Sequence, residues 1–571
     1  MAKTDTAHPT NSAHHHAQHF TSKQRNIALI IVALAFFVDL LDNTIVNIAI
    51  PSIQADLGAS YSSIQWLTAG YALAFAVLLI TGGRLGDVVG YKKLFMIGIA
   101  GFTVASLLSG LAWNTEALIG ARLFQGAMAA LMVPQVMSLM QVMYPPKERG
   151  VVMGMFGALG GLAASLGPII GGLLIEANIG GLDWRPIFLI NLPIGIFAFV
   201  MAIKYLPNGK SPHPLKLDIF GTFLIIIALG LLLFPLIEGR ELDWAPWLFG
   251  LMAASLPVFA LFWWWQLRKT RIDNSPLVIP SLFKARSFKI GLSVNVIFQM
   301  IMLSFFFTFT LVIQIGLGYD VLKAALTGLP TAVGISVAIG FLAQKLTPKL
   351  GRYTMTIGTV VMAIGLGAIV LAMAISGQDT QPWQFIPGLL LTGLGMGMVM
   401  GLMFSVTLKD VDTKHAGSAS GTLNAVSQLG GAIGIAIVGV IFFGQLSTNA
   451  PSTFTNVEPN IRTELTAQQI PTSVQDTIVA NIKSCYVDRS EQKDTSETPE
   501  SCKALEAQTT AETPASKKLG QVIADATTQA ASDNFVLAFR ATIIYAVSLI
   551  GVVFLISFLL PRKIEFEMAS H

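Results

Sequence analysis

The chain has 571 residues, of which 53% are hydrophobic and 12% are charged. Because soluble domains carry about 25% charged residues, this chain has too few polar side chains to cover a surface that faces water. The composition therefore excludes a soluble enzyme, a disordered chain and a nucleic-acid-binding protein, and the small net charge of +4 indicates no polyanionic partner. Two cysteines are too few for a disulfide scaffold or a four-ligand zinc site, and we expect no bound metal.

Long apolar runs recur along the chain, and a run of about 20 residues is enough to cross a bilayer as a helix. The alternating ten-residue strands that a membrane barrel needs are not seen. We therefore expect an all-α polytopic membrane protein with 14 transmembrane helices. In chain order the spans are 27–50, 64–82, 94–112, 117–142, 150–175, 185–204, 218–237, 246–267, 288–313, 321–344, 354–375, 383–408, 417–445 and 535–560.

The positive charges of the short loops indicate the orientation. With the N-terminus inside, the inner loops and helix edges hold 21 Lys and Arg residues, and the short outer loops hold only Arg185, Arg240 and Lys323. The first 26 residues lack the pattern of a cleavable signal peptide, so the first span is expected to direct insertion. We expect the protein in the lipid bilayer of a bacterial cytoplasmic (inner) membrane, with both termini cytoplasmic.

Residues 446–534 form a long polar insert that this topology places outside the membrane. Its length exceeds that of ordinary loops, which indicates either a function or disorder. Both cysteines, Cys485 and Cys502, lie here, and a disulfide can persist on the outer face. We predict that they pair and close a small hairpin-like loop; the alternative is two free thiols. An accessory protein could bind this loop.

An internal repeat relates the two parts of the chain. Residues 150–161 resemble residues 417–428 at an offset of 267 (417 minus 150), and the same offset lays Arg122 on Leu389 and Gln125 on Thr392. Spans 1–6 thus match spans 9–14, as in transporters whose substrate site lies between two such halves. We expect a cytoplasmic tail (1–26), a six-helix half (27–204), two inserted helices with their flanking loops (205–287), helices 9–13 (288–445), an extracytoplasmic loop (446–534), helix 14 (535–560) and a cytoplasmic tail (561–571).

Charged side chains within the spans are functional candidates, because they are costly in a bilayer. Asp39 and Asp42 lie three residues apart and share one face of the first span. We expect Arg122 of span 4 to be their partner, rather than Arg540. An arginine that approaches Asp42 in only one conformation would load and release a proton. The alternative is a fixed ion pair between spans 1 and 4, and Asp39 alone could instead hydrate a cavity or attract a cationic substrate.

Four motifs occur in order along the chain: LDNTIVNIAIP at 41–51, GRLGDVVGYKK at 83–93, RLFQG at 122–126 and GPIIGG at 167–172. Together they resemble the motifs of the 14-span drug:proton antiporters of the major facilitator superfamily. The resemblance covers nearly the whole chain. It implies the major facilitator fold, with two six-helix halves plus two inserted central helices, and proton-driven export by alternating access.

The resemblance also implies a conformational latch in the loop after span 2. Val88 and Tyr91 stand where the family usually has basic residues, and ordinary positive-inside anchoring is the alternative. The latch residues are Gly83, Asp87, Gly90, Lys92 and Lys93.

In span 5 the resemblance implies an antiporter hinge that packs tightly against the other half. Plain close packing of small residues is the alternative. The hinge residues are Gly167, Pro168, Gly171 and Gly172.

Candidate residues of a substrate cavity carry amides or an aromatic ring within the spans. They are Asn43, Gln125, Gln299, Phe306 and Asn424. Flat rings and flexible Met side chains near them suit varied apolar ligands, although packing and lipid contact are alternatives. With the two acids, they predict a transporter that exports small amphiphilic, cationic drugs or toxic compounds.

Other functions remain compatible with these observations. The same fold could export a lipid, a siderophore or a metabolite. A membrane enzyme or sensor is a remote alternative, since the spans hold no His, Cys or Glu constellation. No phosphate-binding loop is present, so we expect no cofactor and a proton gradient as the energy source, although the acids alone do not separate protons from sodium.

Overall fold

The computed structural model describes residues 22–211, 215–411, 416–492, 498–503 and 514–560. Within these ranges the chain is helical and contains no strand. Fourteen helices of the described part are long and apolar enough to cross a membrane, which confirms the expected all-α fold. Most of the two expected tails, 1–26 and 561–571, lies outside the described residues.

The first half of the bundle holds six spans, and the inserted pair follows it. Polar residues begin several of these helices: Ser60 accepts the backbone N–H of Ser63, and Asn114 accepts that of Ala117. The helices are α1 (Ser22–Leu57), α2 (Tyr61–Val89), α3 (Tyr91–Gly110), α4 (Thr115–Met143), α5 (Pro146–Glu176), η1 (Ile179–Gly181), α6 (Pro186–Leu189), α7 (Asn191–Tyr205), α8 (Ile219–Glu238) and α9 (Pro246–Asp273).

The second half holds the other six spans, and two of them contain a short stretch of π-helix. The elements are η2 (Pro280–Lys284), α10 (Arg286–Leu311), η3 (Val312–Gly316), α11 (Val321–Val337), η4 (Ala338–Leu342), α12 (Ala343–Leu350), α13 (Tyr353–Ser376), η5 (Gly377–Asp379), α14 (Pro382–Leu408), α15 (Ala416–Ala467), α16 (Thr472–Glu491) and α18 (Pro514–Ser557).

The two halves pack in the same way. In the first half α4 packs on α2 and α3, and α1 packs on α5 and α7; in the second half α14 packs on α11 and α13, and α10 packs on α15 and α18. Two equivalent seams join the halves, α2 against α15 and α5 against α11. The inserted α8 packs on α9 and contacts both α2 and α15. The packing therefore has the internal symmetry that the sequence repeat predicts.

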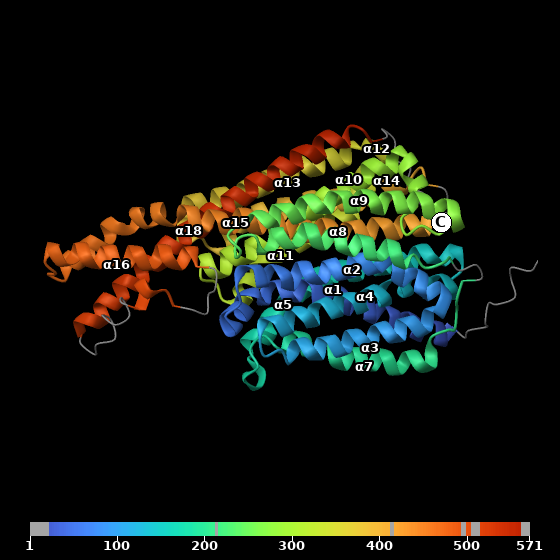
Figure 1. Cartoon of the computed structure of the whole chain (residues 1–571), viewed down its shortest axis with the longest axis horizontal. Coiled ribbons are helices and arrows are strands. Elements are labelled where there is room, and N and C mark those ends of the chain that lie inside the picture. Colours follow the sequence, from blue (N-terminus) through green and yellow to red (C-terminus); the bar gives the residue numbers. More distant parts are fainter. Residues whose placement is uncertain (1–21, 212–214, 412–415, 493–497, 504–513, 561–571) are drawn as a thin grey trace, which may run out of the picture.

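The segment 446–534 is a helical extension that projects from one end of the bundle (Figure 1). Helices α15 and α18 continue past their spans and, with α16, enclose a separate apolar core. Cys485 and Cys502 form a disulfide within it. We call this end of the bundle the insert end, and the opposite end, where α1 begins and α18 ends, the tail end.

We expected a hairpin-like loop only where Cys485 and Cys502 pair, and the helical form of the extension as a whole was not predicted. The length of the insert indicated either a function or disorder, but apolar residues recur at every third or fourth position of α15, which is the spacing of one helix face. These residues are buried in the core of the extension: Ala450, Phe454, Val457, Ile461 and Leu465.

Candidate functional site

The side chain of Asp42 is fully buried in the first half of the bundle, on α1. Its carboxylate accepts three hydrogen bonds, from Arg122 Nη1 at 2.5 Å, from Gln125 Nε2 at 2.9 Å and from Asn191 Nδ2 at 2.7 Å. Arg122 is only 2% exposed, so both members of this ion pair are shielded from solvent. The structure thus brings α1, α4 and α7 together around one carboxylate.

Two members of this cluster were missed by the sequence-based prediction. Asn191 of α7 and Ser106 of α3 are both fully buried, and Ser106 Oγ accepts hydrogen bonds from Gln125 at 3.0 Å and from Asn191 at 3.2 Å. The signal for both was available, because an uncharged polar side chain within a span also needs a partner.

Asp39 lies one helical turn before Asp42 but has a different partner. Tyr71 of α2 donates its hydroxyl hydrogen to Asp39 Oδ1 at 2.6 Å. The ring of the same tyrosine faces Arg122, with 4.3 Å between the guanidinium carbon and the ring centroid, which is a cation–π contact. Tyr71, which the prediction also missed, therefore touches both the second acid and the arginine.

A close approach of α2 and α4 holds Tyr71 in this position. A Cβ atom at Gly126 of α4 would lie 2.4 Å from the backbone oxygen of Tyr71. Nearer the tail end, a Cβ atom at Gly82 would lie 2.3 Å from the backbone oxygen of Ala130. Glycine at each crossing lets the two helices touch through their backbones.

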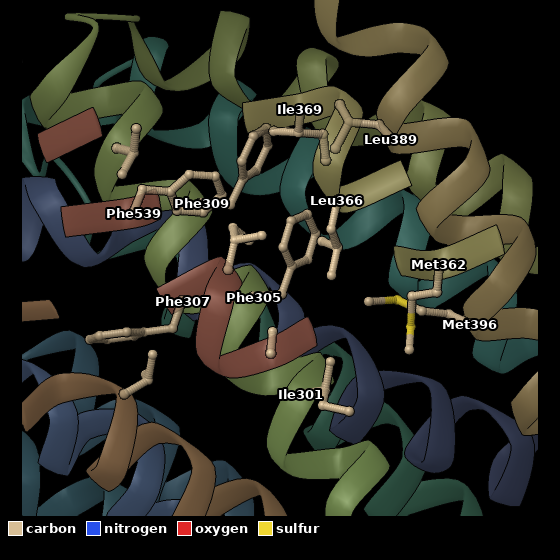
Figure 2. Packing of buried hydrophobic residues seen from close by; sticks show 14 of the residues in the cluster. Ile301, Phe305, Phe307, Phe309, Met362, Leu366, Ile369, Leu389, Met396 and Phe539 are labelled. Atoms are coloured by element: carbon tan, nitrogen blue, oxygen red, sulfur yellow. The ribbon is translucent and has the colours of Figure 1, made fainter. Parts of the chain in front are cut away.

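The equivalent positions in the second half carry no charge. The repeat lays Leu389 on Arg122 and Thr392 on Gln125, and both are fully buried. Figure 2 shows Leu389 beside Ile369 in the apolar core that also contains Phe305 and its neighbours on α10. The charged cluster is thus a feature of the first half, and most of the aromatic run on α10 packs in the core.

The residues of the predicted latch make their described contacts within the first half. Asp87 accepts a hydrogen bond from the Tyr91 hydroxyl at 3.0 Å, and Lys92 Nζ donates to the backbone oxygen of Ile203 at 2.7 Å. Gly90 adopts a φ of 112°, which favours glycine and lets α2 turn sharply into α3. Tyr91, which departs from the family pattern, thus supplies the partner of Asp87. The remaining members are half-buried or exposed: Gly83 and Lys93.

The predicted hinge residues bring α5 against two different helices. Cβ atoms at Gly167 and Gly171 would lie 1.9 and 2.7 Å from side-chain atoms of α1, which belongs to the same half. A Cβ atom at Gly172 would lie 3.2 Å from Leu322 Cα in α11, which belongs to the other half. Pro168 is half-buried between them. The close contact across the halves that the resemblance implies therefore falls on Gly172.

The candidate cavity residues do not form one cluster. Gln125 belongs to the buried cluster described above, and Asn43 is half-buried and donates to a backbone oxygen of its own helix at 3.0 Å. Gln299 and Phe306 are half-buried on α10, whereas Asn424 is exposed on α15. Among the described residues, no hydrogen bond joins the amides of Asn43, Gln299 and Asn424.

Known proteins resemble this chain over most of its length. The family model described as Major Facilitator Superfamily matches residues 32–435. The chain is 40% identical over 540 residues to the probable actinorhodin transporter of Streptomyces coelicolor, covering 95% of this chain and 92% of that protein. It is 32% identical to the tetracenomycin C resistance and export protein of Streptomyces glaucescens, covering 74% of this chain and 77% of that protein. It is also 32% identical to a puromycin resistance protein of Streptomyces alboniger, covering 73% of this chain and 81% of that protein.

Solved structures share the fold at low sequence identity. A bacterial homologue of the human lysosomal transporter Spinster matches with a TM-score of 0.53 and 15% identity, covering 92% of this chain and 99% of that chain. A D-xylose–proton symporter matches with a TM-score of 0.52 and 14% identity, covering 73% of this chain and 90% of that chain. These matches confirm the fold of two six-helix halves that the motifs imply.

Proposed function

The chain belongs to the major facilitator superfamily, and from this premise we propose that it is a proton-coupled antiporter that exports amphiphilic, cationic compounds by alternating access. It is a multi-pass membrane protein, and its relatives include antibiotic resistance and export proteins. The observation that carries the proposal is the buried cluster of Asp39, Asp42 and Arg122.

The formal charges of this cluster do not cancel. With both acids ionised, two negative charges face one positive charge, and each of the three side chains is at most 4% exposed. A buried charge without a partner is costly, so the cluster favours the arrival of one more cation. A proton on either carboxyl group would neutralise the cluster, and so would the cationic group of a substrate beside them.

Exchange requires that the surroundings of Asp42 change between two conformations. In this structure three donors occupy its carboxylate, so a proton can replace them only after Arg122 has moved away. Asp39 has a single described donor, the hydroxyl group of Tyr71. A movement of α4 relative to α1 would separate Arg122 from Asp42 and let the acid take up a proton on one side of the membrane and lose it on the other.

The relatives support a toxic small molecule as the cargo, since their names specify actinorhodin, tetracenomycin C and puromycin. The excess negative charge of the cluster favours cationic members of such a class. Asn43, half-buried on the same helix as the acids, is the candidate for a polar contact to the substrate. We place the tail end in the cytoplasm and the extension outside the bacterial cytoplasmic membrane, with the proton gradient as the energy source.

Liposomes that hold the purified protein and a pH-sensitive dye test this proposal. A panel of cationic and neutral amphiphiles should include compounds that drive proton movement through the native protein. Asp42→Asn should abolish that movement. Asp56→Asn, the same substitution on the same helix, should preserve it, because Asp56 pairs with Arg185 at the insert end. The proposal would be contradicted if Asp42→Asn moved protons as the native protein does, or if no compound of the panel drove proton movement through the native protein.

A further inference from the structure

The last residue of α8 and the start of the turn that leads to α9, residues 238–241, are attached to the first half at the insert end. Glu238 accepts hydrogen bonds from Trp66 Nε1 at 2.7 Å and from Ser62 Oγ at 3.3 Å. Glu241 accepts the backbone N–H of Ser62 at 3.2 Å. These three bonds join the turn to the beginning of α2.

Arg240 attaches the same turn to the extension. Its Nη2 atom donates to the backbone oxygens of Ser490 and Glu491, at 3.1 and 3.5 Å. These carbonyl groups end α16, where the helix dipole favours a positive charge. The guanidinium carbon of Arg240 also lies 5.2 Å from the centroid of the Tyr61 ring, at the start of α2.

Tyr61 lies on the seam between the halves. Its ring stacks on Phe443 of α15, with 4.1 Å between the two centroids. One helical turn further along α2, the buried side chain of Gln65 covers Gly439, where a Cβ atom would lie 2.1 Å from Gln65 Oε1. Helices α2 and α15 are therefore in direct contact at the place that Arg240 covers.

We propose that residues 238–241 are a clasp that holds the insert end closed. Glu238 and Glu241 fix the clasp to the first half, and Arg240 fixes it to α16, which the chain joins to α15 of the second half. To separate α2 from α15 at this end, the protein must release Arg240 from α16 or carry the extension along. The disulfide between Cys485 and Cys502 supports the end of α16 to which Arg240 binds.

The clasp gives the inserted helices and the extension a common function, which is separate from the exchange of protons and substrate. They set how readily the insert end opens, and hence how often a site between the halves is exposed on that side. This function follows from contacts that cross the seam and holds for any cargo.

A single reporter cysteine in the seam tests the clasp. Ala432 of α15 is fully buried in an apolar cluster with α2 and α8, and it lies seven residues, about 10 Å along the helix, beyond Gly439. The native cysteines are paired, so a membrane-impermeant maleimide reports on Ala432→Cys alone. In sealed vesicles with the insert end facing outward, the reagent reaches the seam only from that end, and Arg240→Ala in this background should raise the labelling rate about tenfold, because bonds to a charged donor are lost.

A matched control separates the clasp from a general loss of stability. Arg185 also lies at the insert end, where it pairs with Asp56 at 2.8 Å and faces the ring of Trp184, all within the first half. Arg185→Ala should therefore leave the labelling rate unchanged, and Arg240→Lys should keep part of the protection, since it retains the charge without the planar group.

The clasp would be overturned if Arg240→Ala left the labelling rate of Ala432→Cys unchanged, or if Arg185→Ala raised that rate as much as Arg240→Ala does. Gel filtration of each variant establishes that it is folded. The measurement uses neither substrate nor proton gradient, so its outcome is independent of the proposed transport function.

Discussion

Arg122→Leu should destabilise the protein more than Asp42→Asn and Arg122→Leu do together. Both side chains are almost completely buried. Arg122→Leu leaves the two acids without the cation of the cluster, whereas Asp42→Asn leaves Arg122 with Asp39 as the remaining acid. Breaking a buried ion pair in this way costs about 3–5 kcal/mol. The second half shows that leucine suits such a place, because Leu389 is fully buried at the position that matches Arg122.

The double variant removes both charges of the pair, and of the three charges in the cluster only the Asp39 carboxylate remains, with its hydrogen bond from Tyr71. Replacement of a buried pair by uncharged side chains is often close to neutral, and we expect a coupling energy of at least about 3 kcal/mol between the two sites. The native protein, the two single variants and the double variant form a double-mutant cycle. Asp39 and Tyr71 are the same in all four proteins, so their own contributions to stability cancel in the coupling energy. Denaturant or thermal unfolding in detergent, followed by tryptophan fluorescence, measures the four free energies.

Transport should behave differently from stability in the same cycle. All three variants should lose substrate-driven proton movement, because each lacks a member of the proposed exchange site. Strictly additive losses of stability would refute the view that Asp42 and Arg122 form a buried, mutually compensating pair. Proton movement restored in the stable double variant would refute a role for Asp42 in coupling.

Two further predictions follow from the packing. Gly126→Ala should force α2 and α4 apart and lower the free energy of unfolding by roughly 1–3 kcal/mol, as measured by thermal unfolding. Gly120→Ala is the control on the same helix, because a Cβ atom there would have no neighbour within 4 Å, and it should be neutral or stabilise the protein by up to about 1 kcal/mol. Equal effects of the two substitutions would contradict the close contact at Gly126. Replacement of Cys485 and Cys502 by Ala should destabilise the extension by about 3 kcal/mol, since the pair closes a loop with a sequence separation of 17. Amide exchange should then increase in α16 and stay unchanged in α1–α5, and unchanged exchange in α16 would count against this expectation.

Much of the architecture could be predicted from the sequence, because its causes are local. A bilayer requires about 20 apolar residues per span, so composition alone locates the 14 helices. The repeat that lays Leu389 on Arg122 predicts two similarly packed halves. The cost of charge in lipid singles out Asp39, Asp42 and Arg122 before any contact is known.

The helical form of the extension was also encoded locally but was not predicted. The length and polarity of residues 446–534 left open a function or disorder, while the spacing of apolar residues along α15 carried the helix signal. Composition reports the solvent exposure of a segment, and spacing reports its secondary structure. In a polar segment that builds its own small core, the spacing is the better guide.

The choice of partners within the site was decided by the tertiary structure. Nothing in the spacing of Asp39 and Asp42 shows that Arg122 pairs with Asp42 while Tyr71 binds Asp39. The partners of Asp42 on α4 and α7 lie 80 to 149 residues away in the chain, and only the packing of these helices on α1 brings them to one carboxylate. Periodicity specifies which face of a helix is polar, whereas the atoms that the face meets depend on helix crossings that are set by small residues such as Gly126.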